Sequence, residues 1–280
     1  MSSKFDDLKS KTQTKYKIEP YDDQAKTYTN DPLPINVPSV FSFIGSRGSG
    51  KSTVILSLSR NTYNGVFHRI IFFNPTFFRD EKYQQLLEIP NIIKKKPKEK
   101  EEIPKTKPKN HPYLIEPKEV FTGKIPITDV YTSDIPENLM KIVKQKIELN
   151  NKNERWLIVL DDVASSGLLR NNGFLDILLN GRHLNITLWM GSQFYTALNP
   201  SVRLNTMTWF IFNFSNVKEV KRFYIENSCK LSEEDWFKIY KTATKDPYSF
   251  LTINYHNLHD KCRVFTSSLK NFIYIKDNGL

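Results

Sequence analysis

The stretch that decides the fold is FSFIGSRGSGKSTVILSL, residues 41–58, in which a burst of glycine and serine separates two apolar runs. Three of the chain's 10 glycines fall here, at Gly45, Gly48 and Gly50. Two glycines separated by four residues and followed by lysine and serine fit the pattern G-x-x-x-x-G-K-[ST]. This pattern forms a phosphate-binding loop between a strand and a helix. The sequence therefore predicts a nucleotide-binding loop.

Each residue type in this loop has a physical role toward phosphate. Glycines let the backbone curl so that its N–H groups point at phosphate oxygens, and the positive end of the following helix adds to the attraction. We expect Lys51 to reach the β- and γ-phosphates of ATP, Ser52 to hold Mg²⁺ and Thr53 to lie near the α-phosphate. The predicted nucleotide-binding residues are Gly45, Ser46, Arg47, Gly48, Ser49, Gly50, Lys51, Ser52 and Thr53.

Outward from the loop, strand and helix patterns alternate. An apolar run at 40–45, helical spacing at 53–61 and a β-branched, aromatic run at 69–76 form the βαβ unit of a parallel sheet. The same patterns predict strands at 124–133, 155–163, 185–193, 203–214, 249–256 and 272–277, and helices at 136–151, 173–184 and across 216–247. The predicted fold class is α/β. It is a P-loop NTPase with a mainly parallel sheet flanked by helices and a C-terminal α+β extension.

Composition divides the chain into segments. Residues 1–39 are polar and form a predicted N-terminal arm, residues 40–225 form the predicted ATPase core, and residues 226–280 form an extension packing on it. Within the core, residues 94–109 hold eight lysines, three glutamates and three prolines. Such a composition opposes burial, so we expect an insertion that is either a solvated loop or a contact to nucleic acid.

Charge and cysteine content limit the function classes. Lysine plus arginine outnumber aspartate plus glutamate by 41 to 30, a formal charge of +11, which favours a polyanionic partner such as nucleic acid or a membrane surface. Two cysteines in no metal-like spacing indicate a reducing compartment. The N-terminus lacks a signal-peptide pattern, and no apolar run is long enough to span a membrane. We expect an intracellular soluble protein.

A P-loop NTPase needs a second metal contact, from an aspartate at the tip of a neighbouring buried strand. The run WLIVLDD, residues 156–162, supplies two candidates. We expect Asp161 to bind Mg²⁺, and Asp162 to face the γ-phosphate and orient or deprotonate the attacking water. The next strand ends at Gln193, whose side-chain amide could sense the γ-phosphate or position water if that strand lies beside the loop-bearing one.

With these pieces in this order, the chain resembles the FtsK–HerA family of P-loop ATPases. It looks closest to the DNA-packaging ATPases of poxviruses, giant viruses and virophages. The resemblance spans residues 41 to about 253 and rests on FIGSRGSGKST, IIFFNPT, LIVLDDV, NGRHLNITLWMGSQ, PSVRLN and DPYSFLTI. Two features depart from the pattern: the lysine-rich insertion, and Asp162 where cellular members commonly carry glutamate.

The resemblance implies a homo-oligomeric ring, usually a hexamer, that spends ATP to pump double-stranded DNA into a preformed capsid. It implies a partner at the capsid, such as a portal-like vertex protein. The site of action would be the host cytoplasm or viral factory, or the virion itself. It also implies an arginine finger acting on a neighbouring subunit's ATP. The candidates are Arg203, which we prefer because it follows the Gln193 strand, and Arg182.

A packaging motor must move over any sequence, so we expect it to contact the DNA backbone without sequence preference. The candidate contact is the loop ASSGLLRNNG at 164–173, with Arg170 as a phosphate ligand. The lysine-rich residues 94–109 are the competing candidate.

Two other functions stay open. A nucleotide kinase also begins with a P-loop, but it needs an acceptor pocket and an arginine-bearing lid, and neither pattern is visible. A GTPase needs Asn-Lys-x-Asp, which NKNE at 151–154 fails at its last position. A non-catalytic ATP-binding scaffold would need neither Asp162 nor a finger. ATP turnover measured with and without duplex DNA separates these functions.

Overall fold

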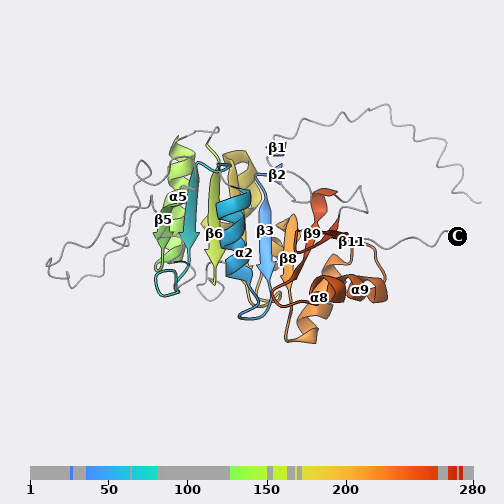
Figure 1. Ribbon diagram of the computed structural model, residues 1–280. Helices are drawn as coiled ribbons and strands as arrows, with labels where there is room; N and C mark the ends of the chain where they lie inside the picture. Colours follow the sequence, from blue (N-terminus) through green and yellow to red (C-terminus); the bar gives the residue numbers. More distant parts are fainter. Residues whose placement is uncertain are drawn as a thin grey trace, which may run out of the picture.

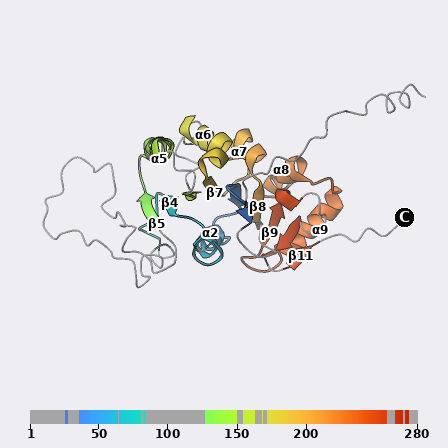
Figure 2. The same cartoon turned by 90° about the horizontal axis from the view of Figure 1, so that it is seen from above.

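The computed structural model describes residues 26–27, 36–63, 65–80, 83, 127–149, 154–162, 168, 172–257, 264–269 and 271–273. Most of the predicted N-terminal arm, the lysine-rich insertion and Arg170 lie outside the described residues, so the expectations for them stay predictions. The described part is built on one nine-stranded sheet with helices on both faces (Figures 1 and 2).

The strands of this sheet run in the order β11-β10-β9-β8-β3-β7-β6-β4-β5. From β5 to β8 all neighbours are parallel, and from β8 to β11 all are antiparallel. The bounds are β3 Val40–Ile44, β4 Arg69–Phe73, β5 Ile127–Tyr131, β6 Trp156–Asp161, β7 Ile186–Ser192, β8 Thr208–Phe212, β9 Phe250–Asn254, β10 Phe265–Ser267 and β11 Asn271–Ile273. A separate pair comprises β1 Lys26–Thr27 and β2 Asn36–Val37.

Helices cover the two faces unequally. Helix α2, Lys51–Ser57, continues into a π-helical turn at Leu58–Thr62 and lies on one face, while α5 to α7 lie on the other (Figure 2). The remaining bounds are α5 Ile135–Leu149, α6 Asn172–Asn180 with a 3-10 turn at Gly181–Leu184, α7 Pro200–Asn205, α8 Val217–Asn227, α9 Glu233–Ala243 and a 3-10 turn at Tyr255–Asn257. In the described part of the chain, no helix combines the length and apolarity that a membrane crossing requires.

The central strands are buried throughout because both faces of the sheet are covered. Every residue of β6 and β7 is buried, as expected for parallel strands between two layers of helices. On the α2 face, Phe41 stacks on Trp189 with ring centroids 5.8 Å apart. On the other face, Trp209 packs edge to face against Phe223 of α8, with centroids 5.1 Å apart.

The structure confirms the predicted fold class and corrects two element assignments. The strand predicted over 203–214 begins only at Thr208, because Asn199 caps a helix there. The Asn199 side chain accepts a hydrogen bond from the Val202 amide at 2.8 Å, and Pro200 occupies the first helical position, where its missing N–H costs nothing. Arg203 therefore lies on a short helix, α7.

The helical stretch predicted across 216–247 is two helices, α8 and α9. Cys229 and Lys230 have positive φ between them, and Ser232 caps α9 by accepting a hydrogen bond from the Asp235 amide at 3.1 Å. Strand β10 is one that the sequence pattern does not predict.

Candidate nucleotide-binding site

The loop after β3 has the backbone of a phosphate-binding loop. Gly45 and Gly50 have φ of 155° and 103°, and the second of these lies in the left-handed region that disfavours a side chain. A Cβ on Gly45 would lie 2.6 Å from the Cβ of Phe212 on β8, so only glycine fits there. These two positions explain why the chain places glycines in this loop.

The loop is fixed to the ends of the two strands beside β3. The Gly45 amide donates to the Ser192 carbonyl on β7 at 3.3 Å, and the Ser46 amide donates to the Asn213 carbonyl after β8 at 3.2 Å. Ser46 Oγ also accepts from the Ser215 amide at 2.7 Å. Anchored in this way, the loop presents the first amides of α2, which have no intrahelical acceptor.

Lys51 begins α2 and is buried. Its ammonium group donates to the carbonyls of Gly45 at 2.7 Å and Ser46 at 2.9 Å, which holds the positive charge inside the curl of the loop. Ser49 Oγ is also buried, and it has no hydrogen-bond partner among the described residues. The loop thus gathers a cation and polar donors where an anion would bind.

Asp161 lies at the end of β6 and is buried. One carboxylate oxygen accepts a hydrogen bond from the Tyr83 hydroxyl, while Oδ1 has no partner among the described residues. Its neighbour in register on β7 is Gly191, where a Cβ would lie 2.0 Å from Oδ1. Gly191 therefore creates the space that the Asp161 carboxylate occupies.

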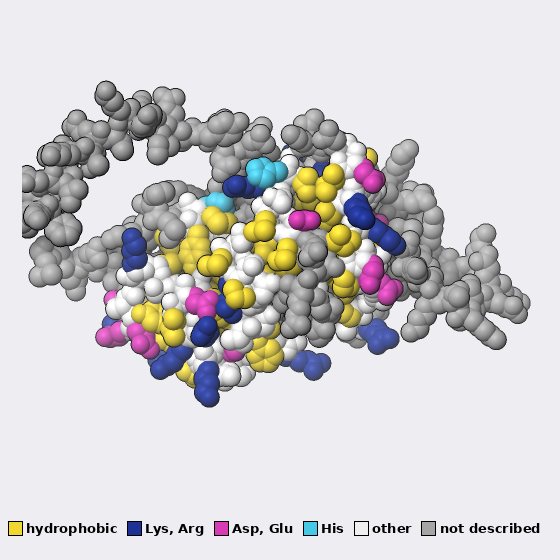
Figure 3. All heavy atoms as spheres, turned by 180° about the vertical axis from the view of Figure 1, so that it is seen from behind, with side chains coloured by type: hydrophobic (Ala, Val, Ile, Leu, Met, Phe, Trp, Pro, Cys, Tyr) yellow, Lys and Arg dark blue, Asp and Glu magenta, His cyan; other side chains and the backbone are white. Residues whose placement is uncertain are grey.

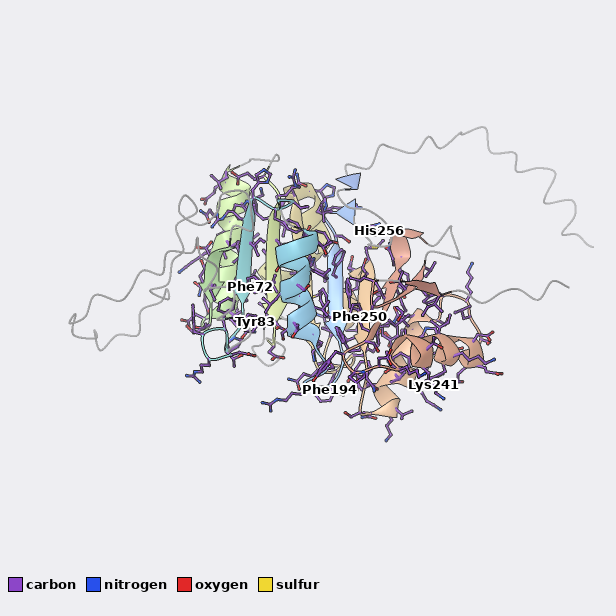
Figure 4. All side chains as sticks on the ribbon, viewed as in Figure 1. Phe72, Tyr83, Phe194, Lys241, Phe250 and His256 are labelled. Atoms are coloured by element: carbon purple, nitrogen blue, oxygen red, sulfur yellow. The ribbon has the colours of Figure 1, made fainter. Side chains whose placement is uncertain are left out.

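Tyr83 and Asn74 position this carboxylate from the β4 side. The Tyr83 hydroxyl, which donates to Asp161, accepts a hydrogen bond from Asn74 Nδ2 at 2.9 Å. Asn74 Oδ1 in turn accepts from the Thr76 amide at 2.7 Å. Tyr83 lies toward the end of the sheet where β3 and β6 terminate (Figure 4). The sequence pattern predicted a site role for neither Tyr83 nor Asn74. The one sequence feature that pointed to this region was the Asn-Pro pair at the end of the β4 run.

The electrostatics of Asp161 favour a cation beside it. Burial raises the pKa of Asp161, the hydrogen bond from Tyr83 opposes this rise, and the negative charge of Asp162 adds to it. The Ser52 side chain and the Lys51 charge lower the pKa of Asp161 again. An unpaired buried carboxylate oxygen beside the Ser52 hydroxyl is the oxygen-donor set that Mg²⁺ prefers, so these residues fit the ion.

The structure brings Asp162 and Gln193 into contact. Strand β7 lies between β3 and β6, which places Gln193 beside both the loop and the Asp162 side chain. Gln193 Nε2 donates to Asp162 Oδ1 at 3.3 Å. Asp162 is exposed and has a φ of 56°, a backbone conformation that turns the chain sharply as it leaves β6.

The two arginine-finger candidates differ in their surroundings. Arg203 Nε lies 3.0 Å from Glu226 Oε2 on α8, and Arg203 Nη1 donates to the Leu198 carbonyl at 3.2 Å. Its guanidinium also lies 5.1 Å from the Tyr195 ring centroid. Arg182 is exposed in the 3-10 turn before β7, and no acidic group among the described residues pairs with it. Arg203 is thus held by contacts within its own chain and Arg182 is not, and the choice between them stays a prediction.

Comparison with known proteins agrees with this architecture. Residues 127–262 match the family model described as Poxvirus A32 protein. These residues are similar to the poxvirus A32 family. The match begins after the phosphate-binding loop and includes Asp161 and Gln193, so the loop itself rests on its motif and its geometry. The predicted relationship to the poxvirus branch is confirmed.

A curated relative of the chain is "Uncharacterized protein 075L" of Invertebrate iridescent virus 6. It is 26% identical over 129 residues, which are 46% of this chain and 50% of that protein. The aligned segment thus spans about half the length of the relative.

Two solved structures share the fold. Genome packaging NTPase B204 from Sulfolobus turreted icosahedral virus 2, in complex with AMP, has a TM-score of 0.54 at 14% identity, covering 86% of this chain and 100% of that chain. The same protein in complex with ATP-gammaS has a TM-score of 0.52 at 15% identity, covering 82% of this chain and 96% of that chain. At these identities the likeness confirms the P-loop NTPase fold.

Proposed function

We propose that the chain is an ATPase that translocates double-stranded DNA into a viral capsid. The observation that carries this proposal is the convergence, at one end of the sheet, of Lys51, the buried Asp161 and the Asp162–Gln193 pair. The match of residues 127–262 to the poxvirus A32 family model supports it. The nucleotide complexes and the genome-packaging description of B204 support ATP as the substrate and packaging as the task.

The phosphates would bind at the start of α2. Backbone N–H groups of the loop donate to the phosphate oxygens, and Lys51 neutralises the β- and γ-phosphates. Ser52 and Asp161 would hold Mg²⁺, which supplies further positive charge to the triphosphate when bound. Tyr83, by donating to one oxygen of Asp161, keeps the other oxygen free for the ion.

Asp162 and Gln193 would act on the attacking water. The exposed carboxylate of Asp162 can accept a proton, and the Gln193 amide 3.3 Å away orients that carboxylate and can itself bind the water or the γ-phosphate. This arrangement favours hydrolysis, because the exposed Asp162 carboxylate is open to water.

The assembly and partners belong to the same proposal. A homo-oligomeric ring, hexameric by resemblance, would supply Arg182 or Arg203 of one subunit to the ATP of the next. DNA would be held through its backbone without sequence preference, and a capsid or portal-like vertex protein would receive the ring. The protein would act in the host cytoplasm or viral factory.

The direct test is ATP turnover with and without duplex DNA. We expect DNA to stimulate hydrolysis. We expect Lys51→Ala to lower turnover by at least about 10²-fold, because Lys51 is buried inside the curl of the loop whereas Arg47, the loop's other cation, is exposed. Lys238→Ala, a change at an exposed lysine of α9, is the matched control and should keep turnover. Phosphate transfer to a nucleoside monophosphate instead of water would favour the kinase.

Asp162→Asn separates hydrolysis from mere binding. Asparagine also tolerates the left-handed backbone at this position and can still accept from Gln193, so the fold should be kept. We expect unchanged ATP affinity and turnover reduced about 10²–10⁴-fold, the usual effect of removing a general base. A non-catalytic scaffold predicts no turnover in the unmodified protein, and hence no difference between the two proteins.

A further inference from the structure

A tight turn leads into β9, and Tyr248 occupies the turn position that requires a positive φ. The Ser249 amide donates to the Asp246 carbonyl at 3.1 Å, closing a turn whose central residues are Pro247 and Tyr248. Tyr248 has a φ of 63°. Proline followed by a residue with positive φ is the pattern of a type II turn, which strongly favours glycine or asparagine at that second position.

Burial does not compensate for this strained conformation. The Tyr248 side chain is 72% exposed, so its ring contributes little to the core. A bulky residue with positive φ is a conformational outlier, and such outliers concentrate at binding and catalytic sites. The turn therefore holds an aromatic ring in solvent at a cost in stability.

The ring borders the phosphate-binding loop. A Cβ on Gly50 would lie 3.5 Å from both Cβ and Cδ1 of Tyr248, so the tyrosine lies against the residue that precedes α2. Strand β9, which Tyr248 precedes, is two strands from β3 on the β8 side, whereas Asp161 and Gln193 lie on the opposite side. If the γ-phosphate of a bound nucleotide faces Asp161, the α-phosphate and the base would point toward the β8 side, where Tyr248 lies.

We propose that Tyr248 is the stacking platform for the nucleobase of the bound nucleotide, and that it favours a purine. This inference rests on the proposed function, since it assigns the base end of the same ATP site. An exposed aromatic ring offers a flat apolar face on which a base can stack. Such stacking strengthens nucleotide binding and does not depend on the hydrogen-bonding groups of the base. The larger face of a purine gains more contact area than a pyrimidine does.

The test compares Tyr248→Gly and Tyr248→Phe in the full chain. Calorimetry measures binding of ATP, CTP and inorganic tripolyphosphate in the presence of Mg²⁺. We expect Tyr248→Gly to bind ATP about 10-fold more weakly, within the range found for one base on one ring, and to bind tripolyphosphate as before. The phenylalanine variant should keep ATP affinity, and the preference of the unmodified protein for ATP over CTP should vanish in the glycine variant.

A second readout excludes a merely structural role. Glycine suits the left-handed position, so Tyr248→Gly should unfold at a higher temperature than the unmodified protein even as it loses ATP affinity. A lower unfolding temperature together with equal losses for ATP and tripolyphosphate would overturn the proposal, because the tyrosine would then only support the loop.

Phe194→Ala is the matched control for removing an exposed ring. Phe194 is 53% exposed and follows Gln193 just after the end of β7, at the same end of the sheet as the loop (Figure 4). The ratio of ATP to tripolyphosphate affinity should not change in this variant. If it falls as far as expected for Tyr248→Gly, the base lies on the β7 side and the assignment is wrong.

The outcomes also separate this inference from the function it rests on. An unmodified protein that binds neither ATP nor tripolyphosphate contradicts the proposed ATPase. A protein that binds both, with no effect of Tyr248→Gly, contradicts only the stacking role.

Discussion

The carboxylate of Asp161 depends on a residue that carries no side chain. Gly191 faces it across the β6–β7 register, and a Cβ there would come within 2.0 Å of Oδ1. The backbone of Gly191 has no positive φ, so its requirement for glycine is purely steric. Gly65 is the opposite case: it has a φ of 74° and open space around it.

These two glycines give a matched pair of substitutions. Gly191→Ala should destabilise the fold by about 1–3 kcal/mol, the usual cost of overpacking, and should abolish turnover by displacing Asp161. Gly65→Ala should cost about 1 kcal/mol through its backbone alone and keep turnover. Thermal unfolding and ATP hydrolysis measured on both variants check this. An active Gly191→Ala protein would show that the Asp161 position is not critical.

At the scale of elements, the segment after Gln193 is tied to helix α8. Thr196 donates through its amide at 3.1 Å and its hydroxyl at 2.8 Å to Glu219, and the Tyr195 hydroxyl donates to Glu226 at 2.7 Å. Arg203 completes the connection through its ion pair with Glu226. The segment after Gln193, the proposed γ-phosphate sensor, is thus held against helix α8.

A double-mutant cycle with Arg203→Ala and Glu226→Ala decides between a structural and a catalytic arginine. If the ion pair fastens α7 to α8, the two changes should couple by about 1 kcal/mol in the free energy of unfolding, and turnover should depend on Arg182 instead. Arg182→Ala should then stop hydrolysis without changing stability. If Arg203→Ala loses turnover and shows no coupling to Glu226→Ala in the free energy of unfolding, Arg203 is the finger.

The coupling between Arg203 and Glu226 in the free energy of unfolding should weaken as pH falls. Burial acts to raise the pKa of Glu226, but hydrogen bonds from Tyr195 and Arg222 outweigh it, so the pKa lies below its ordinary value of 4.5. A carboxylate with a lowered folded-state pKa stabilises the fold above its unfolded pKa. That contribution is lost as pH falls through the folded value. The Arg203–Glu226 coupling should therefore be full at neutral pH and disappear in acid.

At the scale of the whole molecule, charge is unevenly placed along the chain. On the face opposite α2, acidic and basic side chains are interspersed with small groups of apolar ones, rather than forming one basic surface (Figure 3). The lysine-rich residues 94–109 contribute +5 (8 − 3) of the total +11. The two predicted polyanion contacts, residues 94–109 and Arg170, both lie outside the described residues.

DNA binding should follow from backbone contacts. We expect affinity without sequence preference and a log–log salt slope near −0.9 per phosphate contacted. Arg170→Ala should reduce this slope by about one and lose DNA-stimulated turnover, while deletion of 94–109 should weaken binding but keep stimulation. If the deletion loses stimulation and Arg170→Ala does not, the 164–173 loop is the wrong candidate. Binding that ignores salt would exclude the backbone contact itself.

Features that depend on a few neighbouring residues could be predicted from the sequence. Glycine spacing predicts the phosphate-binding loop because backbone curvature depends on a few adjacent residues. Continuous apolar runs predict buried parallel strands, and the polar residues that end them give Asp161 and Asp162. Gln193 could be placed because adjacent parallel strands end at the same edge of a sheet. The start of β8 was missed because the Asn199 cap overrode a strand-like pattern.

Contacts between residues distant in the chain could not be predicted in this way, because they depend on how the elements pack. Tyr83 meets Asp161 across 78 positions. Gly191 clears space for the same carboxylate from another strand, and Tyr248 reaches Gly50 from the far side of β8. Arg203 pairs with α8 because chain packing places Glu226 there. Periodicity and motif spacing do not predict such pairs. They indicate which face of a helix or strand a residue occupies, but not which distant residue packs against it.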